Sequence, residues 1–89
     1  MFGYLILFTN KCLYFLRFTD PYTIVWKRGN AVLSAGNYKV TPDPRIELVD
    51  GFNLKISKVR TQDGGDYICQ LSTYTPMEQI HTLEILGKA

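Results

Sequence analysis

Two cysteines and one histidine carry the most reactive side chains of this chain. Cys12 and Cys69 can form one disulfide, and bridged cysteines in a small domain indicate an oxidising, extracytoplasmic setting. The alternative is a pair of unbridged thiols in a cytosolic protein. His81 has no serine or cysteine at the spacing of a nucleophile and its base. Two cysteines and one distant histidine also fall short of the four ligands of a structural zinc site.

The carboxylates of the chain fall in expected turns or on expected exposed faces. They are too sparse for a calcium loop, which needs several oxygen ligands within about a dozen residues. A tight turn explains the Gly64-Gly65 pair, and no glycine pattern of a phosphate-binding loop is present. We therefore expect no enzyme activity, no cofactor, no metal and no small-molecule substrate.

Length and charge narrow the class further. The 89 residues allow one domain, and the formal net charge of +2 is spread along the chain. Because no run of basic residues is present, we expect no nucleic-acid partner. Asn10 and Lys11 interrupt the apolar blocks of residues 1–18, so neither block reaches the ~20 residues of a membrane span. These blocks also lack the basic start and the small-residue cleavage site of a signal peptide.

The most specific pattern is a tyrosine two residues before a cysteine, preceded by an Asp-Gly turn, DGGDYIC at residues 63–69. This is the sequence form of a tyrosine corner, in which the Tyr67 hydroxyl bonds back to the turn and Cys69 points between two sheets. Together with Trp26, the set resembles the immunoglobulin superfamily over roughly residues 20–87. The resemblance implies an all-β, immunoglobulin-like antiparallel β-sandwich of the V/I type.

The resemblance also implies roles for individual residues. Trp26 is expected to pack on a Cys12–Cys69 bridge between the sheets, with Leu54 pointing inward. Arg45 at the start of a strand and Asp63 in the turn match positions that often form an ion pair in this superfamily. We expect that pair to be largely exposed and to contribute less than about 1 kcal/mol. The predicted core signature is Trp26, Arg45, Leu54, Asp63 and Tyr67.

Alternating apolar residues and turn residues predict a series of short strands after the first 18 residues. The expected ranges are 22–27, 31–34, 38–40, 45–49, 53–59, 66–72 and 77–86, and no helix is expected. A strand centred on Cys12 would put Asn10 and Tyr14 on its inner face, which is atypical. We therefore expect the N-terminal strands to be atypical or truncated. The predicted division is 1–18 as a possible strand B or leader-like segment, 19–87 as the domain and 88–89 as the start of a linker.

The outer face of the expected sheet is apolar at several positions. A water-facing antiparallel sheet usually carries polar residues on its outer side. Apolar residues with a polar border indicate a protein-binding face, and the alternative is scattered exposed aliphatic residues without a function. The predicted face comprises Val25, Lys27, Leu33 (or Val32, depending on the register), Ile68, Gln70, Tyr74, Ile80 and Thr82.

Five segments make the resemblance narrower. They are IVWKRG at 24–29, DPR at 43–45, NLKI at 53–56, QDGGDYICQ at 62–70 and QIHTLEIL at 79–86. They are similar to the first immunoglobulin domain of insect neural adhesion proteins, in the group of klingon, lachesin and the Dpr-interacting proteins. This resemblance implies a domain that binds another immunoglobulin domain, homophilically or heterophilically, through its G-F-C-C′ sheet in neuronal adhesion or synapse specification. It also implies an extracellular position at the neuronal plasma membrane, within a longer protein that carries a membrane anchor.

Three other classes stay open. The first class is a structural spacer domain, and the second is a truncated product without a partner of its own. The third is an antigen-receptor-type variable domain, which fits less well because residues 77–86 lack the Phe-Gly-x-Gly bulge of those domains.

Overall fold

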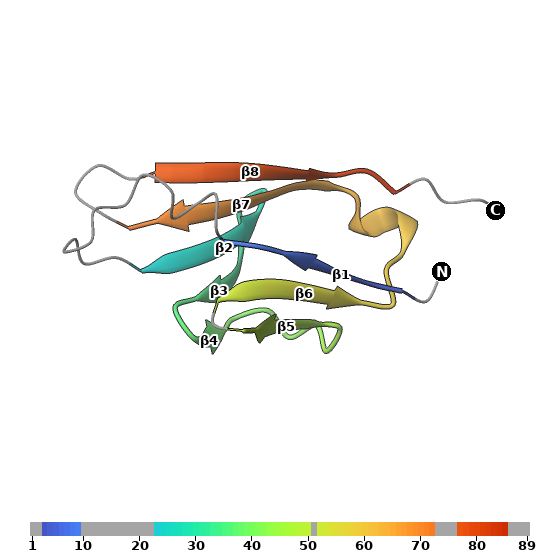
Figure 1. The fold of residues 1–89 in the computed structure, drawn as a ribbon, viewed down its shortest axis with the longest axis horizontal. Helices are drawn as coiled ribbons and strands as arrows, with labels where there is room; N and C mark the ends of the chain where they lie inside the picture. Colours follow the sequence, from blue (N-terminus) through green and yellow to red (C-terminus); the bar gives the residue numbers. More distant parts are fainter. Residues whose placement is uncertain (1–2, 10–22, 51, 73–76, 86–89) are drawn as a thin grey trace.

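The structure is a computed structural model that describes residues 3–9, 23–50, 52–72 and 77–85. The described chain forms two antiparallel sheets that pack face to face (Figure 1). One sheet has the strand order β1-β6-β5, and the other has the order β4-β3-β2-β7-β8. The strands are β1 (Tyr4–Leu7), β2 (Ile24–Arg28), β3 (Ala31–Ala35), β4 (Tyr38–Lys39), β5 (Ile46–Val49), β6 (Asn53–Ser57), β7 (Gly65–Leu71) and β8 (Met77–Leu83). This is the predicted immunoglobulin-like β-sandwich.

Strand β1 places the start of the chain inside the sandwich. It pairs antiparallel with β6, and its last residue, Leu7, lies opposite Leu54. Because strand B lies beside strand E in an immunoglobulin sandwich, β1 occupies the place of strand B. Thr9 strengthens the attachment, since its backbone N–H and its hydroxyl both donate to Asn53 Oδ1, at 2.9 and 3.1 Å. The boundary between residues 18 and 19 stays a prediction.

The five-stranded sheet has β2 and β7 at its centre. Trp26 on β2 lies opposite Cys69 on β7 and opposite Ser34 on β3, so three buried residues cross the sheet in one row. The indole Nε1 of Trp26 donates to the backbone carbonyl of Phe52 at 2.7 Å. Phe52 directly precedes β6, so this hydrogen bond links the two sheets.

A β-bulge interrupts the ladder between β2 and β3. Trp26 pairs with Ser34, but the next residue on β2 pairs with Val32, which leaves Leu33 as one extra residue on β3. Leu33 is only 6% exposed in the core, whereas Val32 is 38% exposed on the outer side. The prediction that Leu33 lies on the outer face is therefore wrong, and Val32 is the outward residue. The bulge is the reason, because it puts Leu33 and Ser34, two successive residues, on the inner side.

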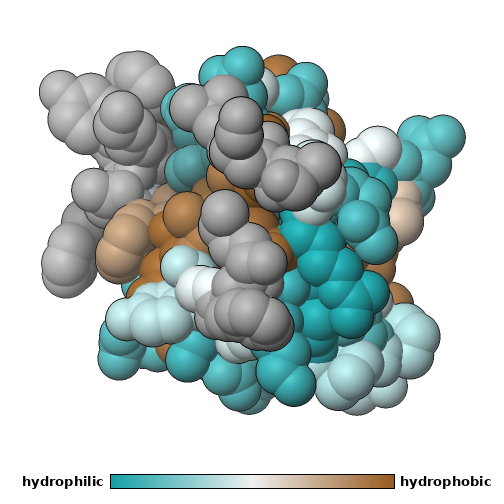
Figure 2. Space-filling model, turned by 90° about the vertical axis from the view of Figure 1, so that its right-hand side faces the viewer, coloured by the Kyte–Doolittle hydropathy of each residue, from teal (hydrophilic) through white to brown (hydrophobic). Residues whose placement is uncertain are grey.

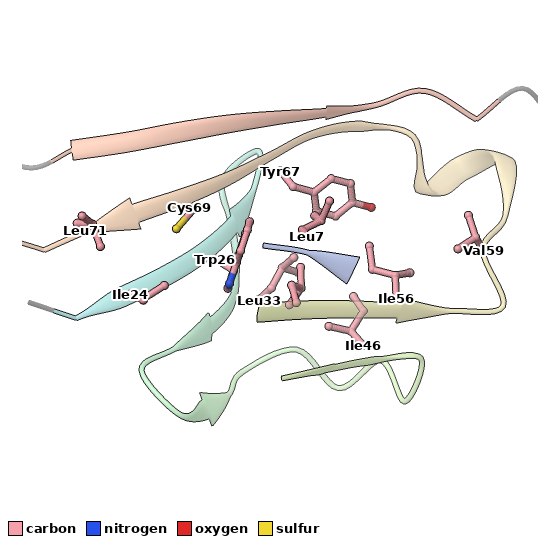
Figure 3. Packing of buried hydrophobic residues seen from close by; sticks show 11 residues of the cluster. Leu7, Ile24, Trp26, Leu33, Ile46, Ile56, Val59, Tyr67, Cys69 and Leu71 are labelled. Carbon is pink, nitrogen blue, oxygen red and sulfur yellow. The ribbon is translucent and has the colours of Figure 1, made fainter. Parts of the chain in front are cut away.

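The hydrophobic core lies between the two sheets. Figure 3 shows Trp26, Tyr67 and Ile56 pointing into the space between the layers. Trp26 and Leu54 are 0% exposed and Tyr67 is 1% exposed, so the predicted core positions of these three residues are confirmed. The other described core residues are Leu7, Ile24, Leu33, Ile46, Ile56, Val59, Cys69 and Leu71.

The turn between β6 and β7 contains a short 3₁₀ helix, η1 (Thr61–Asp63), where the sequence predicted no helix. The Asp63 N–H donates to the Arg60 carbonyl, and the Asp63 carboxylate accepts from the Arg60 N–H at 2.7 Å. These two bonds close a single turn. A helix of three residues is too short for a helical hydrophobic period to show in the sequence.

The seven predicted strands after residue 18 are all present, with ends shifted by a few residues. Strand β8 ends at Leu83 rather than at residue 86, and β6 ends at Ser57 rather than at Val59. Lys58 has a φ of 50°, a left-handed conformation that a continuing strand does not adopt. The end of β6 is therefore set by the backbone turn that leads into η1.

Candidate protein-interaction face

Four outward side chains form a row across the five-stranded sheet. In register order the row runs from Val32 on β3 through Lys27 on β2 and Ile68 on β7 to Ile80 on β8. Val32 and Ile80 are 38% and 53% exposed, and the two central residues are half-buried. Because neighbouring strands lie about 4.8 Å apart, the four side chains form a continuous strip. We call this strip the central row.

Polar residues border the central row along the strands. On one side Gln70 pairs in register with Val25 and with Glu78. On the other side Asp66 pairs with Thr82, whose hydroxyl donates to the Asp66 carboxylate at 2.8 Å. An apolar centre with a polar border is the usual composition of a protein-binding patch. We call the central row with these flanking residues the recognition face.

Most residues predicted for the binding face lie on the outer side of the sheet. Lys27 and Ile68 lie at the centre of the recognition face, and Ile80 lies on its β8 margin. Leu33 lies in the core, and Val32 takes its place. Tyr74 lies outside the described residues, so its position on the rim stays a prediction. The outward residues that match the prediction are Val25, Lys27, Ile68, Gln70, Ile80 and Thr82.

A tyrosine corner fixes the start of β7, which is a central strand of the recognition face. The Tyr67 hydroxyl donates to the backbone carbonyl of Asp63, as the sequence predicts. Burial raises the pKa of Tyr67, so the hydroxyl stays protonated and remains a donor. The buried ring and its hydrogen bond hold β7 at a defined angle, and this sets the direction of its outward side chains.

Arg28 joins the end of β2 to the same turn. Its guanidinium donates to the carbonyls of Gln62 and Gly64, and it lies 5.1 Å from the centroid of the Tyr67 ring. This role was missed at the sequence level. The available signal is spacing, because Arg28 follows Trp26 by two residues and therefore lies on the inner side of β2, where a charge needs partners.

Arg45 and Asp63 form the predicted ion pair. Two guanidinium nitrogens of Arg45 contact the two carboxylate oxygens of Asp63, at 2.8 and 2.9 Å. The expectation that the pair is exposed was wrong, because the side chains are only 15% and 4% exposed. The reason is η1, which turns the Asp63 carboxylate toward the interior. The hydrogen bonds from Arg45 lower the pKa of Asp63, although burial acts in the opposite direction.

Cys69 lies at 0% exposure opposite Trp26, in the position expected for the cysteine of this strand. Cys12 lies outside the described residues, so the Cys12–Cys69 bridge stays a prediction. A bridge of this kind contributes about 2–5 kcal/mol to a small secreted domain. We expect that alkylation in denaturant without reductant labels neither cysteine, as measured by mass spectrometry. Labelling of both cysteines would show two free thiols.

The described residues include no group of three or more histidines, cysteines, aspartates or glutamates that is placed to hold a metal ion. His81 lies on the inner side of β8, and its ring centroid is 5.3 Å from that of Trp26. This contact assigns His81 a packing role against the core. Within the same residues, no helix is long and apolar enough to cross a membrane.

An apolar pocket lies at the end of the sandwich where β1 starts and β8 ends. It is lined by residues 3–5, Val59 and residues 83–85. Figure 2 views the molecule from this end and shows apolar surface that is bordered by hydrophilic residues. Glu84 is the single charged residue in the described lining. The pocket therefore offers packing space and no cluster of catalytic groups.

The chain matches known sequences over about half of its length. No family model matches it. Over 46 residues, which are 52% of the chain, it is 41% identical to protein sidekick-1 of Mus musculus and 39% identical to sidekick-1 of Gallus gallus. The chain spans only 2% of the length of these relatives.

Solved structures extend the similarity to most of the chain. Dpr11 IG1 bound to DIP-gamma matches with a TM-score of 0.70 and 29% identity, over 78% of this chain and 38% of that chain. Dpr1 IG1 bound to DIP-eta IG1 matches with a TM-score of 0.68 and 25% identity, over 74% and 69%. The ZIG-8–RIG-5 IG1–IG1 heterodimer shares the fold, with a TM-score of 0.72 over 94% and 73%. The chain therefore has an immunoglobulin-like fold, and these similarities support the immunoglobulin superfamily.

Proposed function

We propose that this chain is a cell-surface recognition domain that binds another immunoglobulin domain through its recognition face. The central row carries the proposal. Three of its four residues, Val32, Ile68 and Ile80, are apolar on the outer side of a sheet. Docking a second sheet there removes these side chains from water, which favours the complex and offsets part of the entropy lost on association. The polar border provides hydrogen-bonding groups for the rim of such a complex.

The compared structures support a partner of the same fold. Dpr11 IG1 is bound to DIP-gamma and Dpr1 IG1 is bound to DIP-eta IG1 in structures whose folds match this chain. The resemblance to insect neural adhesion proteins and the partial similarity to sidekick-1 support a role in neuronal adhesion or synapse specification. They also support an extracellular position at the plasma membrane for the parent protein. The proposed function requires no catalytic residue, cofactor or metal.

Replacement of Ile80 with aspartate tests the recognition face. Ile80 is 53% exposed, so the Ile80→Asp variant is expected to fold as the wild-type chain does. We expect its binding to an immunoglobulin-domain partner to fall at least about 30-fold, because an apolar contact of the central row is replaced with an unpaired charge. The measurement is surface plasmon resonance against a panel of immunoglobulin-domain ectodomains that includes the chain itself, with circular dichroism to verify the fold.

Phe8→Asp is the matched control. Phe8 is exposed to the same extent, 53%, but it follows β1, which belongs to the other sheet. This variant carries the same added charge and should keep the wild-type affinity. Equal affinity of the Ile80→Asp variant and the wild-type chain would contradict the proposal and favour a spacer domain or another binding surface.

A further inference from the structure

Lys27 is the one charged residue in the central row. Its register neighbours on the two flanking strands are Val32 and Ile68, so its stem lies between two apolar side chains. Among the described residues, the ion pairs are Arg45–Asp43, Arg45–Asp63 and Lys55–Glu47. None of them involves Lys27. Among the described residues, the ammonium of Lys27 therefore has no carboxylate partner while the face is open, and water solvates it.

Two carboxylates on the same face, Glu78 and Asp66, belong to different strands. Glu78 belongs to β8 and pairs in register with Gln70, one row away from the central row. Asp66 belongs to β7, the strand next to β2, and accepts a hydrogen bond from Thr82. Strand β7 separates Lys27 from Glu78, and none of the described ion pairs joins Lys27 to Asp66.

A partner that covers the central row removes Lys27 from water. Burial of a charge is unfavourable unless an opposite charge lies next to it. Two identical copies would be related by a two-fold axis. A residue on the axis would face the same residue of the second copy, and a residue i beside the axis would face a residue j whose partner is in turn residue i. An axis along the central row places Lys27 against Lys27, and an axis along the strands between β2 and β7 places it against Ile68. Both of these arrangements leave the ammonium buried without a carboxylate, whereas an oblique axis would bring it to Glu78 of the second copy, which is the arrangement that the test below must exclude.

We propose that Lys27 selects a heterophilic partner whose facing row carries a carboxylate opposite it. This inference rests on the proposed function, and it specifies the chemistry of the partner. The partner is an immunoglobulin domain with an acidic residue among apolar residues, aligned row against row with this face. The apolar residues of the central row supply affinity, and Lys27 supplies discrimination against a second copy of this chain.

A charge-swapped copy of the chain provides such a partner. In the Lys27→Glu variant, the same row presents a carboxylate at the same position. We expect wild-type chain and variant each to be monomeric alone, and their equimolar mixture to associate at least about 10-fold more tightly than either alone. Sedimentation velocity at about 100 μM measures this, and raising the NaCl concentration from about 0.05 to about 0.5 M should weaken the mixed dimer.

Two further variants make the test specific. Lys39→Glu changes the net charge equally, but Lys39 pairs in register with the buried Ser34 and therefore points away from the recognition face. A mixture of wild-type chain with this variant should stay monomeric. Adding Ile80→Asp to one member of the wild-type and Lys27→Glu pair should abolish the mixed dimer.

Several outcomes would overturn the inference. If the mixture of wild-type chain and Lys27→Glu variant associated no more tightly than the wild-type chain alone, a carboxylate opposite Lys27 would not strengthen pairing. Self-association of the wild-type chain that Lys27→Glu and Glu78→Gln both weaken would show that the chain pairs with itself through Lys27 and Glu78. If the proposed function itself were wrong, the result would differ from both of these. Ile80→Asp would then change neither the association of the mixed pair nor the affinity for the ectodomain panel.

Discussion

The Arg45→Ala variant is expected to be less stable than the wild-type chain by about 3–5 kcal/mol, the usual effect of removing one partner from a buried ion pair. Arg45 binds both carboxylate oxygens of Asp63, and the Asp63 side chain is only 4% exposed. Without the guanidinium, the carboxylate keeps the Arg60 N–H as its described donor. Urea denaturation at pH 7, followed by tryptophan fluorescence, measures the free energy of unfolding.

An exposed ion pair provides the control for this variant. Glu47 contacts Lys55 at 3.7 Å, with side chains that are 57% and 29% exposed. Glu47→Gln removes that attraction and should lower the free energy of unfolding by less than about 1 kcal/mol. If Arg45→Ala had no larger effect than Glu47→Gln, the Arg45–Asp63 pair would not be a major source of stability.

The same pair makes stability depend on pH. The hydrogen bonds from Arg45 lower the pKa of Asp63 in the folded chain, and the backbone hydrogen bond to Arg45 is the main cause that lowers the pKa of Asp43. A carboxyl group with a lowered folded pKa stabilises the fold above its unfolded pKa, and this contribution is lost as pH falls through the folded pKa. The wild-type chain should therefore lose stability below about pH 4. The difference from Arg45→Ala should shrink there, because a protonated Asp63 no longer leaves a buried charge unpaired.

The β-sandwich could be predicted from the sequence because its signals are a short motif and a regular alternation along the strands. DGGDYIC places a turn, a tyrosine corner and a buried cysteine within seven residues, and Tyr67 and Cys69 are buried as this pattern predicts. Alternation in the later strands predicts which side chains point inward, and Leu54 and Ile56 are 0% and 1% exposed. These features depend on neighbours in the chain, so one sequence reveals them.

The wrong predictions concern features that depend on how the strands pair or on how deeply a side chain is buried. The side to which Leu33 points is decided by a bulge, and a bulge is visible only once β3 is paired with β2. The burial of Asp63 is decided by η1 and by the strand end that carries Arg45. The isolation of Lys27 is visible only when the register places it between Val32 and Ile68. Three-dimensional context therefore supplied the surroundings of Lys27, whereas the sequence had already placed Lys27 on the outer face.

The start of the chain is the region where sequence patterns were least informative, and Leu7→Ala tests it. Leu7 is 8% exposed, lies opposite Leu54 and belongs to the hydrophobic core. Truncating it should lower the free energy of unfolding by about 2–5 kcal/mol, because a buried leucine is replaced with a cavity. Urea denaturation of the full chain measures this loss.

Phe8→Ala is the matched control, because Phe8 is the next residue and is 53% exposed. It should change the free energy of unfolding by less than about 0.5 kcal/mol, as surface substitutions usually do. A large loss for Leu7→Ala alone means that β1 is a structural strand, so the recognition face rests on a second sheet that includes β1. Equal, small effects of both variants would mean that residues 4–7 do not pack in solution. The recognition face would then stand on a sandwich that lacks its strand at the B position.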